Sequence, residues 1–355
     1  SRTALIFPNK RANLFFNEYL AGESDQPIWS PAAMSISDLF QKLSVQKSGD
    51  PIRLVCELYK VFKEETRSQE TLDDFYFWGE LLISDFDDVD KNMVDADKLF
   101  SNLQDLKNLM DDYEFLDKEQ EEAIQQFFQN FSIEKRTELK EKFISLWDKL
   151  GTIYHRYRAN LTELGIAYEG MLYRNVIEQL DTDQLKYDKY IFVGFNVLNK
   201  VESDFFRKLK DAGKALFYWD YDIFYTQQIK KHEAGEFLKR NLEEFPNELP
   251  ESFFNTFKEP KKIRYISAST ENAQARFLPG WIKAITNDHS QITVEKEKEN
   301  AVVLCNEALL LPVLHSIPQE VKNVNITMGF PLAQTPVYSF INAAMELQTN
   351  GYRSD

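Results

Sequence analysis

The stretch Tyr190-Ile191-Phe192-Val193-Gly194 is a continuous apolar run that ends at a glycine, and residues 4–7 and 215–219 have the same character. Short apolar runs without alternation are typical of strands that are buried on both faces, as in parallel sheets. Apolar residues at helical spacing follow residues 4–7 (Ala12, Phe15, Phe16, Tyr19, Leu20) and residues 190–193 (Leu198, Val201, Phe205, Leu209). Strands that alternate with helices in this way predict an α/β fold with a parallel sheet.

A long helical stretch separates these strands. Between residues 50 and 180, apolar residues recur at helical spacing, which in the simplest interpretation marks core contacts, and Gly165 is a helix stop. We therefore predict a discontinuous α/β domain at residues 1–49 and 181–242, interrupted by a helical insertion at 50–180. Further apolar runs at 263–266, 301–304 and 324–328 predict that a second α/β unit begins at 261 and continues to 355.

The composition limits the class of protein. About 43% of the 355 residues are apolar, which is enough for real cores and excludes wholesale disorder. No apolar run approaches the ~18 residues of a membrane span, and no secretory leader opens the chain. Cys56 and Cys305 lack metal spacing and are typical of a reducing compartment, so we predict a cytoplasmic protein. The opening Ser1-Arg2-Thr3 and the closing residues suggest a piece of a longer protein.

The negative charge is concentrated in one segment. Residues 69–122 hold 18 Asp and Glu side chains against 4 lysines, whereas the net charge of the whole chain is -15. Such a segment would repel phosphates, so it is a poor nucleic-acid coat. It fits a solvated helical face, a docking surface for a basic partner that includes Asp87, Asp88 and Asp90, or a wall that shapes a DNA path by repulsion.

The familiar catalytic and nucleotide-binding motifs are missing from this sequence. There is no phosphate-binding Gly-x-x-x-x-Gly-Lys-Ser/Thr loop, and the only Gly-Lys pair, Gly213-Lys214, lacks the rest of the pattern. The four histidines are scattered, and none begins a metal pair. We assign no catalytic residue and no metal ligand.

A basic turn follows the first predicted strand. In Phe7-Pro8-Asn9-Lys10-Arg11-Ala12-Asn13, a buried strand ends and a helix begins with two cations in its first turn. Ligands of open α/β sheets lie at the carboxyl ends of strands, and outward N–H groups beside cations suit a phosphate. An ordinary basic surface turn is the alternative. Trp29 fits a core position or, less favourably, a platform for a nucleic-acid base.

The predicted strand at 190–193 ends without a carboxylate. An active ATPase of the P-loop type needs an acidic residue at such a strand end to hold Mg²⁺, but Val193 and Gly194 stand there. Asp204 lies about three helical turns further on and does not substitute simply. Asp220 follows the next predicted strand.

Taken in order, these segments resemble an AddB-type subunit of the bacterial helicase–nuclease (AddAB/RecBCD class), whose members are superfamily 1 helicase-like proteins. Residues 7–11 resemble the family's motif Ia, which contacts single-stranded DNA. Residues 35–39 resemble the Leu-Thr-Leu-x-x-Leu segment that follows this motif in the family. Residues 86–96 resemble the family's acidic helical insertion, and residues 168–174 resemble the end of that insertion. Residues 192–195 fall at the Walker B position, and residues 271–347 resemble the start of the second motor domain.

The resemblance implies two RecA-like domains, the first interrupted by a 1B-like helical insertion. It implies DNA contacts by Asn9, Lys10, Arg11, Asn13 and Ser35, and a degenerate nucleotide site at Val193, Gly194 and Asp220. It also implies a motor-inactive subunit of a double-strand-break repair complex that guides a strand of single-stranded or unwinding duplex DNA beside an active AddA-type partner. No cofactor is expected in this stretch, no membrane is involved, and a PD-(D/E)XK nuclease domain would lie beyond Asp355.

Two alternatives stay open. The first is an active DNA-dependent ATPase whose Walker A motif precedes Ser1 and whose Mg²⁺ ligand comes from elsewhere in the chain, such as Asp220. Only this alternative calls for ATP and Mg²⁺. The second is a protein-interaction scaffold that uses the acidic helices and does not bind DNA.

Overall fold

The computed structural model describes residues 2–23, 26, 27, 29–100, 136–226, 233–285 and 300–350, with the backbone alone at 136–148, 283–285 and 350. The chain divides into two compact units, Ser1–Glu259 and Pro260–Asp355. The part of the acidic segment between residues 101 and 122 lies outside the described residues. The predicted role of the segment as a solvated face, a docking surface or a wall is therefore considered below only for residues 69–100.

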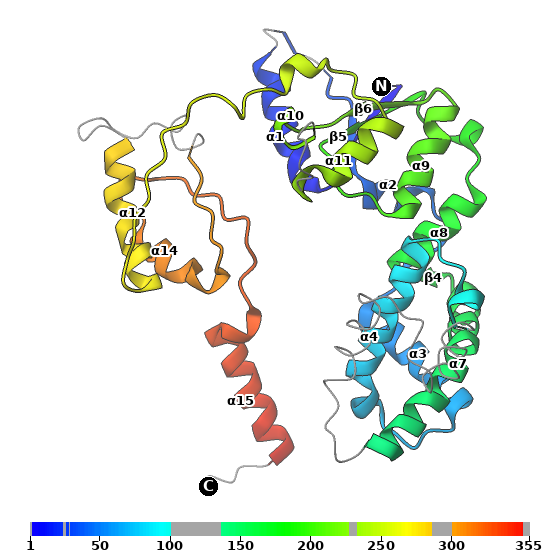
Figure 1. Cartoon of the computed structure of the whole chain (residues 1–355). Helices are drawn as coiled ribbons and strands as arrows, with labels where there is room; N and C mark the ends of the chain where they lie inside the picture. Colours follow the sequence, from blue (N-terminus) through cyan, green and yellow to red (C-terminus); the bar gives the residue numbers. More distant parts are fainter. Residues whose placement is uncertain are drawn as a thin grey trace, which may run out of the picture. The chain divides into compact units, whose positions relative to one another are not determined.

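A parallel sheet forms the upper part of the first unit in the view of Figure 1. Its strands are β1 (Thr3–Phe7), β2 (Ala32–Ser35), β5 (Lys189–Val193) and β6 (Ala215–Tyr218), in the order β2-β1-β5-β6. The register pairs Ile6 with both Met34 and Phe192. The predicted α/β class with a parallel sheet is confirmed.

The central strands are buried on both faces, which explains their continuous apolar runs. In β1, Ala4 and Ile6 belong to the main hydrophobic core, while Leu5 and Phe7 are buried on the opposite face. Alternation along β5 likewise directs Phe192 into the main core and leaves Val193 half-buried.

Aromatic side chains join the sheet to the helices on its main-core face. These helices are α2 (Ile36–Leu43), α8 (Glu169–Gln179) and α9 (Lys200–Asp211). The Phe40 ring stacks on Tyr173 at 4.1 Å between centroids and lies 5.1 Å from Phe205. The Phe192 ring lies 4.0 Å from Phe206. Packed rings of this kind contribute beyond the area they bury, so this layer fixes the helices against the strands.

The opposite face carries α1 (Lys10–Gly22), which is held less deeply. Phe16 contacts Phe7 at 5.8 Å between ring centroids, but α1 has no buried residue. The helix is present as predicted, yet the Tyr19 side chain is 75% exposed. The core position favoured for Trp29 is wrong, because this side chain, in the segment between α1 and β2, is 99% exposed.

Between β2 and β5, the described residues that follow α2 form the helices α3 (Pro51–Thr66), α4 (Leu72–Lys91), α7 (Arg136–Glu163) and α8. They pack together below the sheet in Figure 1. The stretch is not wholly helical, because β3 (Lys47–Ser48) pairs in parallel with β4 (Ile166–Ala167). Gly165 precedes β4 with φ of 68°, the left-handed conformation that a glycine adopts easily after a helix.

A buried carboxylate connects three of these helices. Asp90 of α4 is fully buried and accepts hydrogen bonds from Tyr154 Oη at 2.6 Å and from Tyr168 Oη. Arg158 and Arg174 form ion pairs with the same carboxylate. The prediction that Asp90 belongs to a solvated or docking face is therefore wrong. Asp87 also bonds internally, to Lys91 and to the Gly170 backbone N–H, whereas Asp88 is exposed.

The remaining elements complete the two units. In the first unit they are α10 (Ile223–Thr226), α11 (Glu233–Glu244) and the 3-10 turns Thr182–Gln184 and Glu251–Phe253. In the second unit they are α12 (Glu271–Ile285), α14 (Leu310–Ser316), α15 (Pro336–Asn350) and the 3-10 turns Glu307–Leu309 and Leu332–Gln334.

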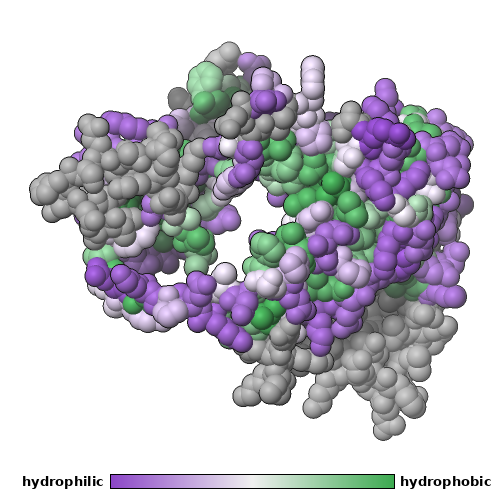
Figure 2. All heavy atoms as spheres, turned by 90° about the horizontal axis from the view of Figure 1, so that it is seen from above, coloured by the Kyte–Doolittle hydropathy of each residue, from purple (hydrophilic) through white to green (hydrophobic). Residues whose placement is uncertain are grey.

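The strands predicted in the second unit are wrong for the described residues. Residues 263–266, 301–304 and 324–328 pair with no other segment as strands. A strand is stable when its backbone groups pair and its side chains are covered, and here Tyr265 and Val303 are almost fully exposed. Figure 2 shows hydrophobic residues at the surface of the molecule between hydrophilic ones.

Asp90 provides a test of the helical packing. We expect Asp90→Asn to lower the free energy of unfolding by about 3 kcal/mol, because two half-buried arginines lose the fully buried counter-charge that they share. Urea unfolding followed by circular dichroism measures this change. Asp88→Asn is the matched control on the same helix and should stay within about 0.5 kcal/mol of the wild type. We call Asp90 and its four partners, Tyr154, Arg158, Tyr168 and Arg174, the Asp90 hub. Equal effects of the two substitutions would contradict a stabilising role for this hub.

Candidate nucleic-acid interface at the carboxyl edge of the sheet

The candidate site lies where the crossover direction of the sheet reverses. The chain leaves β1 towards β2 on one side and leaves β5 towards β6 on the other, although β1 and β5 are neighbours. In open α/β sheets, ligands bind beside the carboxyl ends of strands at such a switch point. The two segments that flank it begin at Pro8 and Gly194.

The turn after β1 places two cations at this edge. Asn9 has an extended backbone, and its Oδ1 accepts a hydrogen bond from the Ala12 N–H at 3.1 Å, which makes it the N-cap of α1. Lys10 and Arg11 occupy the first turn, where both are exposed. No acidic residue stands in that turn, so the positive end of the helix dipole faces two like charges. An anionic ligand would relieve this local repulsion.

Ser35 and Asp38 form the neighbouring helix start. Ser35 ends β2 and is buried, and its hydroxyl donates to Asp38 Oδ2 at 2.8 Å. The Asp38 N–H donates to that hydroxyl at 3.2 Å, and the Ser35 N–H donates to Asp38 Oδ2 at 3.3 Å. This reciprocal capping box fixes the first turn of α2. The Ser35 hydroxyl therefore forms its hydrogen bonds within the protein, and these bonds position the Asp38 carboxylate.

Asp38 links the two helix starts, because its Oδ1 lies 3.1 Å from Lys10 Nζ. Burial acts to raise the pKa of Asp38, but the hydrogen bonds from Ser35 and Lys10 outweigh burial and lower it below the ordinary value of 3.8. The Lys10 side chain remains 79% exposed despite this ion pair. Sequence reasoning missed the link, although Ser-x-x-Asp at residues 35–38 is a recognisable capping signal.

The ends of β5 and β6 complete the edge. Gly194 adopts φ of 73°, and its N–H donates to the Tyr218 carbonyl at 3.0 Å. Val193 is half-buried, and Asp220 is exposed just beyond β6, one of the two edge strands of the sheet. Asp204 lies within α9, where it pairs with Lys200 and Arg207. The structure therefore brings Asn9, Lys10 and Ser35 to one edge with Val193 and Gly194.

A second group of ionisable side chains is satisfied internally. Lys91 pairs with Asp87 at 2.8 Å and with Glu169 at 2.7 Å, which joins the end of α4 to the start of α8. Glu202 is nearby at the start of α9, and burial raises its pKa. Among the residues that the structure describes, no three His, Cys, Asp or Glu side chains gather closely enough to hold a metal ion.

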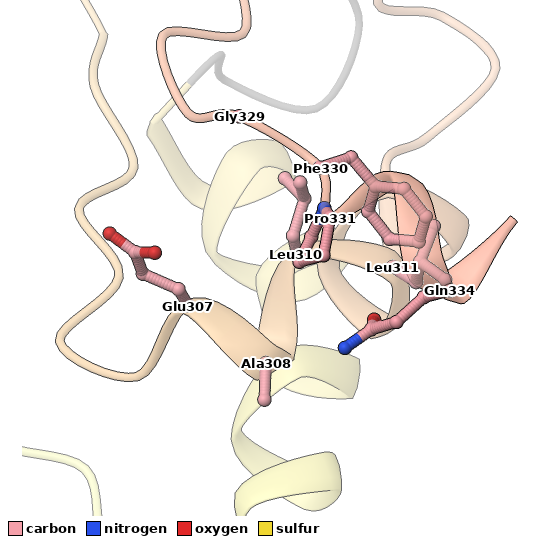
Figure 3. A pocket seen from close by; sticks show the side chains of 8 residues that line it. All are labelled: Glu307, Ala308, Leu310, Leu311, Gly329, Phe330, Pro331 and Gln334. Atoms are coloured by element: carbon pink, nitrogen blue, oxygen red, sulfur yellow. The ribbon is translucent and has the colours of Figure 1, made fainter. Parts of the chain in front are cut away.

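Two surface pockets occur among the described residues, one in each unit. A pocket of about 450 Å³ belongs to the second unit and is lined mainly by apolar side chains, with the Glu307 carboxylate apart from the Gln334 amide (Figure 3). Another, of about 330 Å³, lies between the ends of α2 and α8. Neither brings together a nucleophile, a base and an anion-binding group, so neither is a convincing active site.

Comparison with protein-family models found no match, and comparison with curated proteins found none either. Within the described parts of the chain, no helix combines the length and apolar character needed to cross a bilayer. Evidence about function therefore comes from the geometry of the edge itself.

The link between Lys10 and Asp38 makes stability depend on pH. We expect Asp38→Asn to cost about 1 kcal/mol at neutral pH, because the substitution removes hydrogen bonds of the carboxylate. Because the folded-state pKa lies below 3.8, this contribution is present above the ordinary pKa and is lost as pH falls through the folded-state value. Urea unfolding at pH values from neutral to below 3.8 measures this contribution to the free energy of unfolding, and the exposed substitution Asp211→Asn is the control. A difference between variant and wild type that stays constant down to the lowest pH would contradict the assigned interactions.

Proposed function

We propose that the chain is a helicase-like DNA-binding subunit that guides a single strand of DNA without hydrolysing nucleotide. The observation that carries the proposal is the placement of Lys10 and Arg11 at the first turn of α1, beside the switch point between β1 and β5. Phosphate contacts dominate the affinity of proteins for nucleic acid, and they come from Lys, Arg, polar side chains and helix starts. This turn supplies each of these groups.

The polar neighbours of the two cations suit a strand that passes along the surface. Asn13 lies one turn beyond Lys10 on the same face of α1, and its Oδ1 accepts from Asn17 Nδ2 at 3.1 Å. Asn9 acts through the helix start, since its side chain caps α1. Ser35 acts indirectly, by holding Asp38 beside Lys10.

The absence of an acidic residue at the end of β5 supports a subunit that lacks motor activity. A P-loop motor holds Mg²⁺ with an acidic residue at such a strand end, whereas Val193 and the left-handed Gly194 occupy it here. Asp220 follows β6 instead, one strand further from β1. A guiding role beside an active partner fits a body with the sheet of a motor but without its magnesium ligand.

The resemblance to AddB-type subunits extends this proposal. It gives the partner as an AddA-type helicase–nuclease subunit, the setting as cytoplasmic double-strand-break repair, and the substrate as single-stranded or unwinding duplex DNA. By the same resemblance, we propose that the helices between β2 and β5 are a 1B-like insertion in a RecA-like domain, and that residues 261–355 are part of a second RecA-like domain. The buried position of Asp90 weakens the alternative of an acidic docking scaffold on α4.

The basic turn is tested by neutralising it. We expect Lys10→Ala/Arg11→Ala to weaken binding of a labelled oligothymidylate, measured by fluorescence anisotropy over a range of salt concentrations. The slope of log affinity against log salt should become shallower by about 0.7 for each phosphate that the variant no longer neutralises, because fewer counterions are released.

Lys239→Ala/Arg240→Ala is the matched control, since it removes an adjacent Lys-Arg pair from the exposed face of α11. This control should retain the wild-type affinity and slope. If both double variants bind alike, the β1–α1 turn is not the interface. If the wild-type chain shows no binding at low salt, the DNA-guiding function is wrong.

Nucleotide turnover separates the guiding subunit from an active motor. We expect the full-length protein, including any residues before Ser1, to hydrolyse ATP no faster than a buffer blank in the presence of Mg²⁺, with or without oligothymidylate, because β5 ends without a carboxylate. A coupled phosphate-release assay measures this rate. DNA-stimulated hydrolysis that Asp220→Asn abolishes and Asp211→Asn preserves would contradict the proposal and establish Asp220 as the magnesium ligand.

A further inference from the structure

Trp29 stands out among the aromatic residues because its indole is 99% exposed. A tryptophan usually buries much of its large surface and dominates the energetics of cores and interfaces. Trp219, which is 3% exposed and donates its indole N–H to the Phe245 carbonyl at 2.8 Å, shows the usual arrangement in this chain. The exposed indole of Trp29 makes no such burial, so both faces of its ring are open to a ligand.

The residue after Trp29 is attached to α1. Ser30 Oγ donates to Asn17 Oδ1 at 2.9 Å, and Asn17 Nδ2 donates to Asn13 Oδ1 at 3.1 Å. Lys10, Asn13 and Asn17 are spaced three and four residues apart, so they lie on one face of the helix. A continuous row of polar side chains therefore leads from the first turn of α1 to the backbone beside Trp29.

The row has the length of a short piece of single strand. At a rise of 1.5 Å per residue, Lys10 and Asn17 are about 10 Å apart along the helix axis, which is about three nucleotides at roughly 3.4 Å per nucleotide of a stacked strand. One end carries the cation and the other carries the aromatic platform. Surfaces that bind single strands combine a backbone track with aromatic side chains on which bases stack.

We propose that Trp29 stacks on an unpaired base of a strand whose sugar–phosphate backbone follows Lys10, Asn13 and Asn17. The ligand is single-stranded nucleic acid, because paired bases inside a duplex do not offer a face to a side chain. This inference rests on the proposed function and adds a stacking contact to it. Stacking is tolerant of sequence, since every base has a π-face, so the contact would guide a strand without selecting it.

The test measures oligothymidylate binding by fluorescence anisotropy for Trp29→Ala and Trp29→Phe. We expect Trp29→Ala to weaken binding roughly 5- to 150-fold, the usual effect of removing one base–aromatic stack, and Trp29→Phe to retain most of the affinity. The salt slope should not change, because stacking releases no counterions. Trp78→Ala, which removes another exposed tryptophan on α4, should bind like the wild type.

An oligonucleotide that carries the same sugar–phosphate backbone without bases provides the second measurement. The wild type and Trp29→Ala should bind this abasic strand equally, since neither can stack. Unfolding curves should coincide for the wild type and both Trp29 variants, because an exposed side chain contributes little to stability.

The outcomes separate this inference from the proposed function. If binding depends on Lys10 and Arg11 but Trp29→Ala binds oligothymidylate like the wild type, the stacking contact is wrong and the DNA-guiding function stands. If the wild type does not bind single strands, both are wrong. If Trp29→Ala leaves DNA binding intact but abolishes association with an AddA-type subunit, Trp29 contacts protein, and the inference is overturned.

Discussion

The parallel pairing of β1 with β5 is the constraint on which the first unit depends. β1 ends at Phe7 and β5 begins only at Lys189, yet their backbones form one hydrogen-bonded ladder. Parallel strands require a crossover, and the described part of this one contains α1, β2 and the helices α2, α3, α4, α7 and α8. The pairing places β2 and β6 on opposite sides, so the crossover direction reverses between β1 and β5. The candidate site exists because of this reversal.

Two kinds of packing hold the long crossover to the sheet. Stacked and tilted rings around Phe40 and Phe192 attach α2, α8 and α9 to the strands. The Asp90 hub attaches α4 to α7 and α8 with hydrogen bonds whose partners are themselves largely buried. Replacing a buried charge cluster by apolar residues is often neutral for stability, so we attribute to the hub the choice of one helix arrangement over others. A fixed arrangement keeps the loops at the edge of the sheet in place.

The sequence predicted the strands well where burial on both faces left a continuous apolar run, as at residues 4–7 and 190–193. The same signal was misleading at residues 263–266, because periodicity does not show whether a run finds a partner strand. Asp90 was misjudged for the converse reason, since its two tyrosines and two arginines come from distant parts of the chain. The Lys10–Asp38 link needed the adjacency of β1 and β2, although the capping signal at Ser35 was readable. The exposure of Trp29 could not be predicted from the sequence, because it depends on which segments pack around the stretch between α1 and β2.

The candidate site combines features that act at different ranges. Lys10 and Arg11 would attract any polyanion, and their effect falls as salt screens it. Asn13, Asn17 and Trp29 act only on a strand that lies in contact with α1. Photocross-linking of a thiothymidine oligonucleotide to the chain, mapped by mass spectrometry, tests this placement most directly. The account predicts cross-links at residues 9–17 and at Trp29. Cross-links confined to α11 or to the unit Pro260–Asp355 would contradict it.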